Sequence, residues 1–142
     1  MITQRPKILV TRPLIDEALQ DLRREFEVDL NSEDHVLSKP NLIERLRGKQ
    51  GVLPLVTDII DREVLESAPG LRVVANFGVG FDNIDVRSAT NLGIVVTNTP
   101  GVLTETTADF AWTLLMAAAR RVIEADKYIR AKQFREWTRN CL

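Results

Sequence analysis

Cysteine and histidine are almost missing from this 142-residue sequence, which contains one of each, Cys141 and His35. A single cysteine excludes an internal disulfide, and one histidine excludes metal sites built from several histidines. No apolar run approaches the roughly 18 residues of a membrane-spanning helix, and the N-terminus lacks the apolar stretch of a signal peptide. We therefore expect no metal site, no membrane association and a cytoplasmic location.

An excess of positive charge is also lacking, since the formal net charge is −1. This balance argues against a nucleic acid as partner. The charge is unevenly distributed, because residues 1–119 sum to −5 and residues 120–142 to +4. The basic segment is either an interaction arm or the solvated end of a helix, where cations are favourable. The second explanation is the simpler one.

The residues that are present describe an α/β protein. At 44% apolar and 27% charged residues, the composition is that of an ordinary globular domain. Short apolar runs predict strands, which are Lys7–Thr11, Val28–Leu30, Gly51–Val56, Leu71–Phe77 and Gly93–Thr97. Helical spacing of apolar residues predicts helices between them, which are Leu14–Phe26, Asn41–Arg47, Asp61–Ser67 and Asp85–Asn91. Alternating strands and helices imply a mostly parallel sheet covered on both faces.

The last segment predicts one long helix, because no glycine or proline interrupts the sequence from Thr104 to about Arg135. Its apolar residues recur at alternating spacings of three and four, at positions 108, 111, 115, 118, 122, 125 and 129. Such a helix is longer than a small sheet needs. Part of it packs outside the domain, or it is a long crossover helix of the same domain.

Ligands of parallel α/β sheets bind beyond the carboxyl ends of the strands. The fourth predicted strand leads into Gly78-Val79-Gly80. Two glycines around one residue let backbone N–H groups approach an anion such as a carboxylate. The same pattern also occurs in ordinary strand-to-helix turns. It is not the dinucleotide-binding fingerprint, whose third glycine falls at Asn83.

Two further strand ends carry candidate residues. After the fifth strand, Thr104 is a candidate N-cap, and Thr106 and Thr107 in the first helical turn either face a phosphate or simply cap the helix. After the third strand, Leu55 and Val56 can form a small apolar wall. His35, beside two acidic residues, is interpreted as a solvated loop histidine and not as a catalytic base.

Three linked motifs give a resemblance to a known family. The motifs, at residues 73–85, 93–104 and 107–109, resemble the NAD(P)-dependent D-isomer-specific 2-hydroxyacid dehydrogenases, most of all the glyoxylate/hydroxypyruvate reductase branch. The resemblance implies a flavodoxin-like parallel sheet flanked by helices. It makes residues 1–103 the substrate-binding domain, and residues 104–142 an interdomain helix and arm that lead to a coenzyme-binding domain.

The resemblance also assigns roles to residues. The backbone N–H groups of Val79 and Gly80 bind the substrate carboxylate, Leu55 and Val56 line the pocket, and Thr107 contacts the phosphates of NAD or NADP. Asp109 stands where many members carry glutamate.

Trp137 resembles an aromatic residue that reaches the active site of the neighbouring subunit, which implies a homodimer. Arg139 replaces the proline that usually follows that tryptophan by two residues. At this position the sequence departs from the family's pattern.

No residue of the sequence matches the family's catalytic arginine, acid or histidine. In the family these groups belong to the coenzyme-binding domain, which would follow Leu142, so we assign no catalytic residue here. The reaction implied for the complete enzyme is hydride transfer to a small 2-oxo acid, glyoxylate or hydroxypyruvate, while the 142-residue chain alone is expected to be inactive. The alternatives are a non-catalytic flavodoxin-like interaction module and a truncated, inactive fragment.

Overall fold

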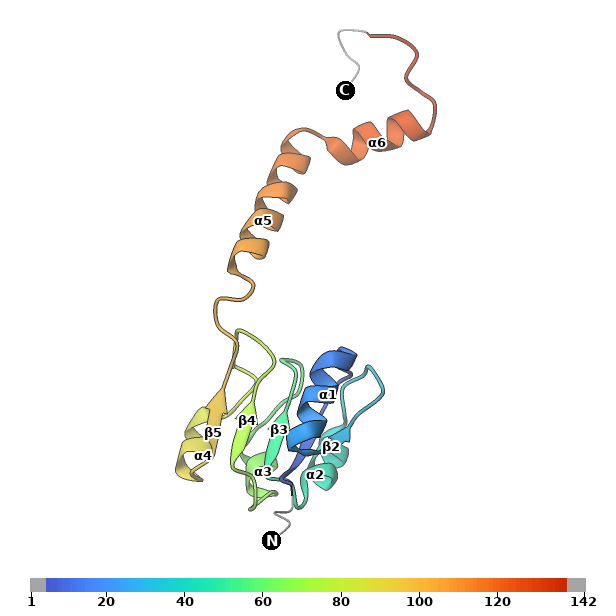
Figure 1. Cartoon of the computed structure of the whole chain (residues 1–142). Helices are drawn as coiled ribbons and strands as arrows, with labels where there is room; N and C mark the ends of the chain where they lie inside the picture. The colour runs from blue at the N-terminus through green and yellow to red at the C-terminus, as the bar shows by residue number, and fades with distance from the viewer. Residues whose placement is uncertain (1–4, 138–142) are drawn as a thin grey trace. The chain divides into compact units, whose positions relative to one another are not determined.

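The fold is built on a parallel sheet of five strands in the order β2-β1-β3-β4-β5, seen in a computed structural model that describes residues 5–137 (Figure 1). The strands are β1 (Lys7–Val10), β2 (Glu27–Leu30), β3 (Gly51–Leu53), β4 (Val73–Ala75) and β5 (Val95–Thr97). All four pairings between neighbours are parallel. The predicted strands and their parallel arrangement are confirmed, and the strand order is the flavodoxin-like one.

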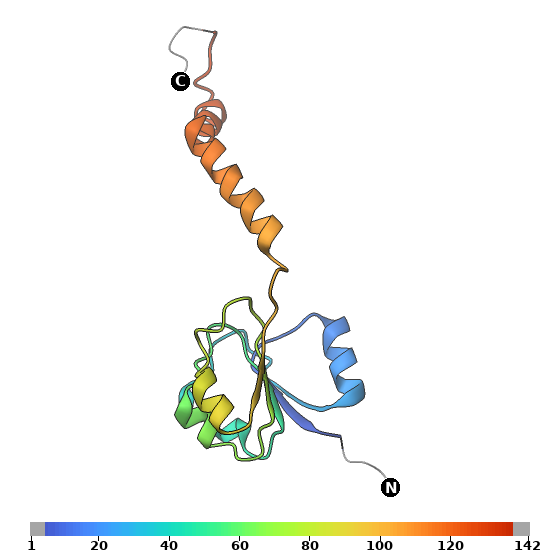
Figure 2. The ribbon, with the colours of Figure 1, turned by 90° about the vertical axis from the view of Figure 1, so that its left-hand side faces the viewer.

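Four helices connect the strands and cover the sheet unequally. They are α1 (Asp16–Glu25), α2 (Lys39–Leu46), α3 (Arg62–Glu66) and α4 (Val86–Asn91). Figure 2 shows α1 on one face and the other three on the opposite face. The α/β class with helices on both faces is confirmed. On the thinly covered face, a groove beside α1 is lined by apolar residues that include Leu22, Leu53 and Phe77.

The main core lies between the middle of the sheet and α2, α3 and α4. Leu9, Val52 and Val74, one from each central strand, are buried in a cluster with residues of these helices, among them Leu46 and Val64. Successive side chains of a strand point to opposite faces. Close packing against these helices therefore holds the sheet on one face. The loops that follow the strands start from this well-packed sheet.

The two short helices α3 and α4 each begin at an aspartate whose side chain caps the first turn. The Asp61 carboxylate accepts the Val64 N–H at 3.1 Å, and the Asp85 carboxylate accepts the Ser88 N–H at 2.9 Å. A hydrogen bond from Lys39 lowers the pKa of Asp61, and the hydrogen bond from the backbone of Ser88 lowers the pKa of Asp85. Both carboxylates are thus held in the charged form that caps a helix best.

The chain divides into two units after Gly101, and the second contains α5 (Thr104–Ala119) and α6 (Val122–Arg130). The expectation of one continuous helix to about Arg135 is wrong, because Arg121 adopts a left-handed conformation with φ of 51°. This conformation breaks the regular i to i−4 hydrogen bonds. Figure 1 shows the resulting change of direction between α5 and α6. The predicted apolar stripe is interrupted at the same place.

The start of α5 also differs from the expectation. Leu103 occupies the N-cap position and makes no side-chain cap, so Thr104 is the first helical residue and does not cap the helix. The Thr106 hydroxyl instead donates to the Leu103 carbonyl at 3.1 Å. The helix therefore begins without a side-chain oxygen over its first N–H groups.

Large apolar side chains remain exposed on α5 and α6, including Phe110, Trp112, Val122 and Ile129. Burial of each such side chain is worth about 1.5–3 kcal/mol, which in sum favours association. We expect the 142-residue chain to self-associate through residues 112–137, and Val122→Lys with Ile129→Lys to shift it toward monomer in sedimentation velocity.

The matched control for this experiment is Gln20→Lys with Asn41→Lys, which adds two positive charges at exposed positions of α1 and α2 without removing an apolar side chain. It should leave the association unchanged. A clean monomer of the unaltered chain at high concentration would show that these helices need no further partner surface.

Candidate functional site

The carboxyl ends of β3 and β4 continue as two loops that lie side by side. Leu55 forms an isolated parallel bridge with Phe77, and Ile60 forms another with Ile84. The Phe77 N–H donates to the Pro54 carbonyl at 2.8 Å. The structure thereby joins the loop of residues 54–61, which contains Leu55 and Val56, to the loop of residues 76–84, which contains Val79 and Gly80.

Within the loop of residues 76–84, Gly78, Val79 and Gly80 form what we call the glycine loop. Each of their three carbonyl groups accepts a hydrogen bond from the protein. The Gly78 carbonyl accepts the Thr99 N–H at 2.9 Å, and the Val79 carbonyl accepts the Asn98 Nδ2 at 2.7 Å. The Gly80 carbonyl accepts the Asn76 Nδ2 at 2.7 Å. The N–H and C=O of a trans peptide point in opposite directions, so these bonds fix where the following N–H groups point.

Three of those N–H groups, on Val79, Gly80 and Phe81, are available to a ligand. Within residues 5–137, none of the three finds a hydrogen-bond acceptor, and all three residues are exposed. Consecutive backbone N–H groups of this kind form concavities that bind anions. The sequence pattern pointed to Val79 and Gly80 and gave Phe81 no role.

Gly78 and Gly80 lie in this loop for different structural reasons. A Cβ atom on Gly78 would lie 2.1 Å from Val56 Cγ1, so any larger residue here would force the Val56 side chain to move. A Cβ atom on Gly80 would meet only the Asp82 carboxylate oxygen, at 3.0 Å. Gly78 therefore serves the packing of the loops, while the space around Gly80 is open enough for a ligand.

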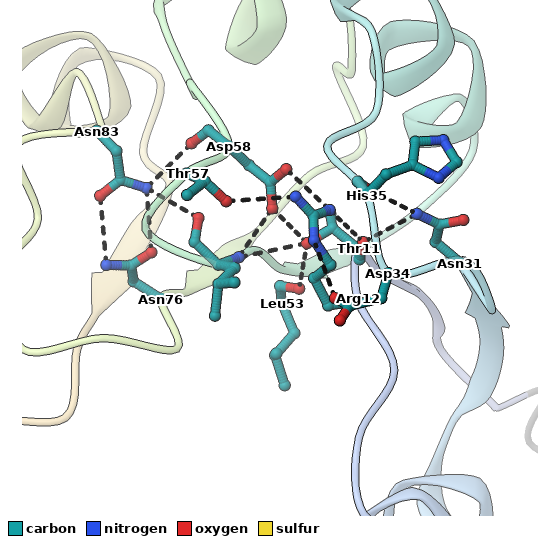
Figure 3. Close-up of polar contacts among 11 residues, drawn as sticks. Thr11, Arg12, Asn31, Asp34, His35, Leu53, Thr57, Asp58, Asn76 and Asn83 are labelled. Atoms are coloured by element: carbon teal, nitrogen blue, oxygen red, sulfur yellow. Dashed lines mark hydrogen bonds and ion pairs between the residues drawn. The ribbon is translucent and has the colours of Figure 1, made fainter. Parts of the chain in front are cut away.

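A buried pair of carboxamides lies beneath the two loops. Asn76 and Asn83 are 2% and 6% exposed and bond to each other, as the dashed lines in Figure 3 show. The Asn83 Nδ2 also donates to the Asp58 carbonyl at 3.0 Å. The sequence reasoning gave neither asparagine a role, although a polar residue directly after a buried strand was a usable signal for Asn76.

A buried ion pair supports the first of the two loops. The Asp58 carboxylate, 1% exposed, accepts the Thr11 hydroxyl at 2.5 Å and the Leu55 N–H at 2.9 Å. Arg12, which directly follows Thr11, lies 3.4 Å from its other oxygen (Figure 3). This cluster was also missed in the sequence. Its carboxylate is satisfied by protein donors, so its work is to shape the loop.

The residues predicted from the second unit lie on α5 and beyond α6. The Thr107 N–H donates to the Leu103 carbonyl at 2.9 Å, and Thr107 is exposed in the first turn of α5. The Trp137 ring packs edge-on against the Phe134 ring, with 5.2 Å between the ring centroids. Trp137 is 88% exposed. Arg139 and Cys141 lie outside the described residues.

The described residues add three simpler findings. His35 is exposed, and its Nδ1 lies 3.1 Å from the Glu33 carboxylate, in agreement with a solvated loop histidine. Residues 5–137 contain no group of three or more potential metal-ligating side chains. None of the helices seen in this part of the chain has the length and apolar character needed to cross a bilayer.

Taken together, the strand order and the glycine loop at the strand ends define a flavodoxin-like domain with a candidate anion site. Residues 8–138 match the family described as D-isomer specific 2-hydroxyacid dehydrogenase, catalytic domain, and the chain belongs to this family. The resemblance drawn from the sequence motifs is confirmed.

Individual relatives support the same assignment. The chain is 55% identical over 126 residues to a glyoxylate reductase from Korarchaeum cryptofilum (strain OPF8), a match that covers 89% of this chain and 38% of the relative. Among solved structures, the TT0316 protein from Thermus thermophilus is 44% identical with a TM-score of 0.86, over 95% of this chain and 43% of that chain. A cofactor (NAD+) bound 3-phosphoglycerate dehydrogenase from Entamoeba histolytica is 28% identical with a TM-score of 0.67, over 80% and 39%. The chain thus spans less than half the length of each relative.

Proposed function

We propose that this chain forms the substrate-binding part of an oxidoreductase that reduces a small 2-oxo acid of the glyoxylate or hydroxypyruvate type with NADH or NADPH. The observation that carries the proposal is the pair of N–H groups of Val79 and Gly80, left unbonded at the carboxyl end of the sheet. The identity to a glyoxylate reductase supports this class of substrate.

In this proposal the two loops divide the work of holding the acid. The N–H groups of Val79 and Gly80 bind the carboxylate, and the bonds to the carbonyls of Gly78 and Val79 keep those N–H groups in place before the substrate arrives. Leu55 and the half-exposed Val56 lie on the neighbouring loop and shield the bound acid from water. No described residue is assigned the proton transfer.

The start of α5 fits a phosphate of the dinucleotide. Because Thr107 makes the bond to the Leu103 carbonyl and Leu103 provides no side-chain cap, the N–H groups before Thr107 have no acceptor within the helix. Such N–H groups at a helix start attract phosphate, and the exposed Thr107 can add its hydroxyl. The dinucleotide, when bound, supplies the hydride. Glu105 in the same turn is the one residue that opposes an anion there.

The proposal extends to the assembly and the location of the protein. Trp137 is exposed and apolar, as a residue that contacts a neighbouring subunit must be in the isolated chain. A homodimer in which Trp137 reaches the partner's substrate, working in the cytoplasm, is the arrangement that we propose.

A chimera tests the function. Residues 8–138 of this chain replace the matching segment of the Korarchaeum cryptofilum relative, to which the chain is 55% identical. We expect the chimera to reduce glyoxylate with NADH or NADPH, and Gly80→Val to lower kcat/KM by about 100-fold, because the added side chain covers the N–H groups that hold the carboxylate. The fold should persist, since only the exposed Asp82 side chain must move.

Gly70→Val is the matched control. Gly70 lies before the amino end of β4, whereas the glycine loop follows its carboxyl end. A Cβ atom on Gly70 would meet only the Lys49 carbonyl, at 3.5 Å. Its kcat/KM should match that of the unaltered chimera. An unchanged kcat/KM in Gly80→Val would remove the loop from the substrate site, and a folded chimera without any reductase activity would favour a non-catalytic binding module.

A further inference from the structure

Asn76 and Asn83 are buried, but their hydrogen bonds lead to the two exposed loops of the candidate site. The Asn76 Nδ2 reaches the Gly80 carbonyl at 2.7 Å. The Asn83 Nδ2 reaches the Asp58 carbonyl at 3.0 Å and the Leu55 carbonyl at 3.4 Å. Between them, the two carboxamides exchange bonds of 3.2 and 3.4 Å.

The N–H donors of the pair are used entirely in this connection. Backbone carbonyls only accept hydrogen bonds, so each must face a nitrogen of a carboxamide, which fixes how Asn76 and Asn83 are turned. No buried side-chain nitrogen or oxygen of the described chain lacks a partner. The pair therefore forms a continuous bridge from the loop of residues 54–61 to the loop of residues 76–84.

We propose that Asn76 and Asn83 are positioning residues that set the spacing between the carboxylate-binding N–H groups and the apolar wall of the substrate pocket. This inference rests on the proposed function. Asn76 holds the Gly80 carbonyl, while Asn98 holds that of Val79, so residue 80 is fixed on both of its peptide planes. Asn83 transmits this position to Leu55 and Asp58 on the opposite loop.

Asn76→Asp is the sharpest substitution, because it keeps the shape of the side chain and removes the two N–H donors. The control is Asn31→Asp. Asn31 is equally buried and donates to two backbone carbonyls, those of Thr11 at 3.1 Å and His35 at 3.3 Å. Neither of these acceptors belongs to the two loops. A loss of general stability should therefore affect both variants, while a positioning effect should be confined to Asn76→Asp.

Hydrogen exchange measured by mass spectrometry on the 142-residue chain tests the bridge without any substrate. In Asn76→Asp, we expect faster exchange in the peptides that contain Leu55 and Asp58 as well as in those that contain Phe77 and Gly78. Asn31→Asp should leave the peptides that contain Phe77 and Gly78 unchanged, because its only route to the two loops runs through Thr11 to Asp58. Faster exchange in only the loop that carries Asn76 would overturn the coupling, whatever the function of the protein.

Kinetics of the chimera test the consequence for the substrate. Asn76→Asp is expected to raise the KM for glyoxylate about tenfold, with kcat and the KM for the dinucleotide changed less than about threefold, because carboxylate binding is lost and hydride transfer is not. Asn31→Asp should leave all three constants unchanged. If Asn76→Asp does not fold, Asn76→Ala removes the carboxamide without adding a charge and is measured in its place.

The hydrogen-exchange and kinetic experiments together distinguish a failure of this inference from a failure of the proposed function. Coupled exchange with an unchanged KM in an active chimera means that the pair serves stability alone, and the inference is wrong. An unsubstituted chimera that is folded but inactive contradicts the proposed function, and the positioning role fails with it.

Discussion

Asp58→Ala is expected to lower the free energy of unfolding of the sheet domain by about 3–5 kcal/mol, because it leaves a buried guanidinium without its buried counter-ion. Arg12 is 7% exposed and lies 3.4 Å from the Asp58 carboxylate. The substitution also removes the acceptor of the Thr11 hydroxyl and of the Leu55 N–H. Urea denaturation, with the midpoint and the slope fitted separately, measures the loss.

The exposed neighbour Asp34 provides the control for this prediction. Its carboxylate lies 3.9 Å from the Arg12 Nε, but it is almost fully solvated, so Asp34→Ala should cost less than about 1 kcal/mol. Adding Arg12→Met to Asp58→Ala removes the unpaired charge and should recover a large part of the stability. Equal losses in Asp58→Ala and Asp34→Ala would show that burial of the pair does not matter.

The regular elements of the sheet could be predicted because they follow local patterns. Leu9, Val52 and Val74 sit in short apolar runs, and a strand buried on both faces needs such a run. The flavodoxin-like order of the strands is not local information, and in the sequence it came from the resemblance to a family. At Arg121 the local apolar pattern continues although the helix does not, so the prediction of a continuous helix failed. A left-handed residue within a helical pattern has no signal when it is neither glycine nor asparagine.

The polar residues beneath the site show why part of it could not be predicted. Asp58 and Thr11 are 47 positions apart in the sequence, and only the pairing of β1 with β3 brings them together. A search for chemistry-bearing motifs selects exposed groups such as the N–H groups of Val79 and Gly80. Buried residues that hold those groups in place have no fixed spacing, because they are placed by the register of the sheet.

Gly78→Ala is expected to destabilise the sheet domain by about 1–3 kcal/mol, the usual effect of overpacking a close contact. The new methyl group would lie 2.1 Å from Val56 Cγ1, which is far inside van der Waals contact. Val56 is branched at Cβ, so few χ1 rotamers are open to it and moving its side chain costs free energy. The two candidate substrate loops meet at this contact. The added methyl group would push them apart, which should also lower kcat/KM of the chimera.

A double-mutant cycle with Val56→Ala isolates this contact. Val56 is half exposed, so Val56→Ala alone should cost little, and the pair Gly78→Ala with Val56→Ala should regain most of the lost stability. Gly70→Ala is the matched control. It meets only the Lys49 carbonyl at ordinary contact distance, 3.5 Å, and should be neutral or stabilising by about 0.4–1 kcal/mol. If the losses of Gly78→Ala and Val56→Ala simply add, the two loops do not depend on each other at this point, and glycine at position 78 has another cause.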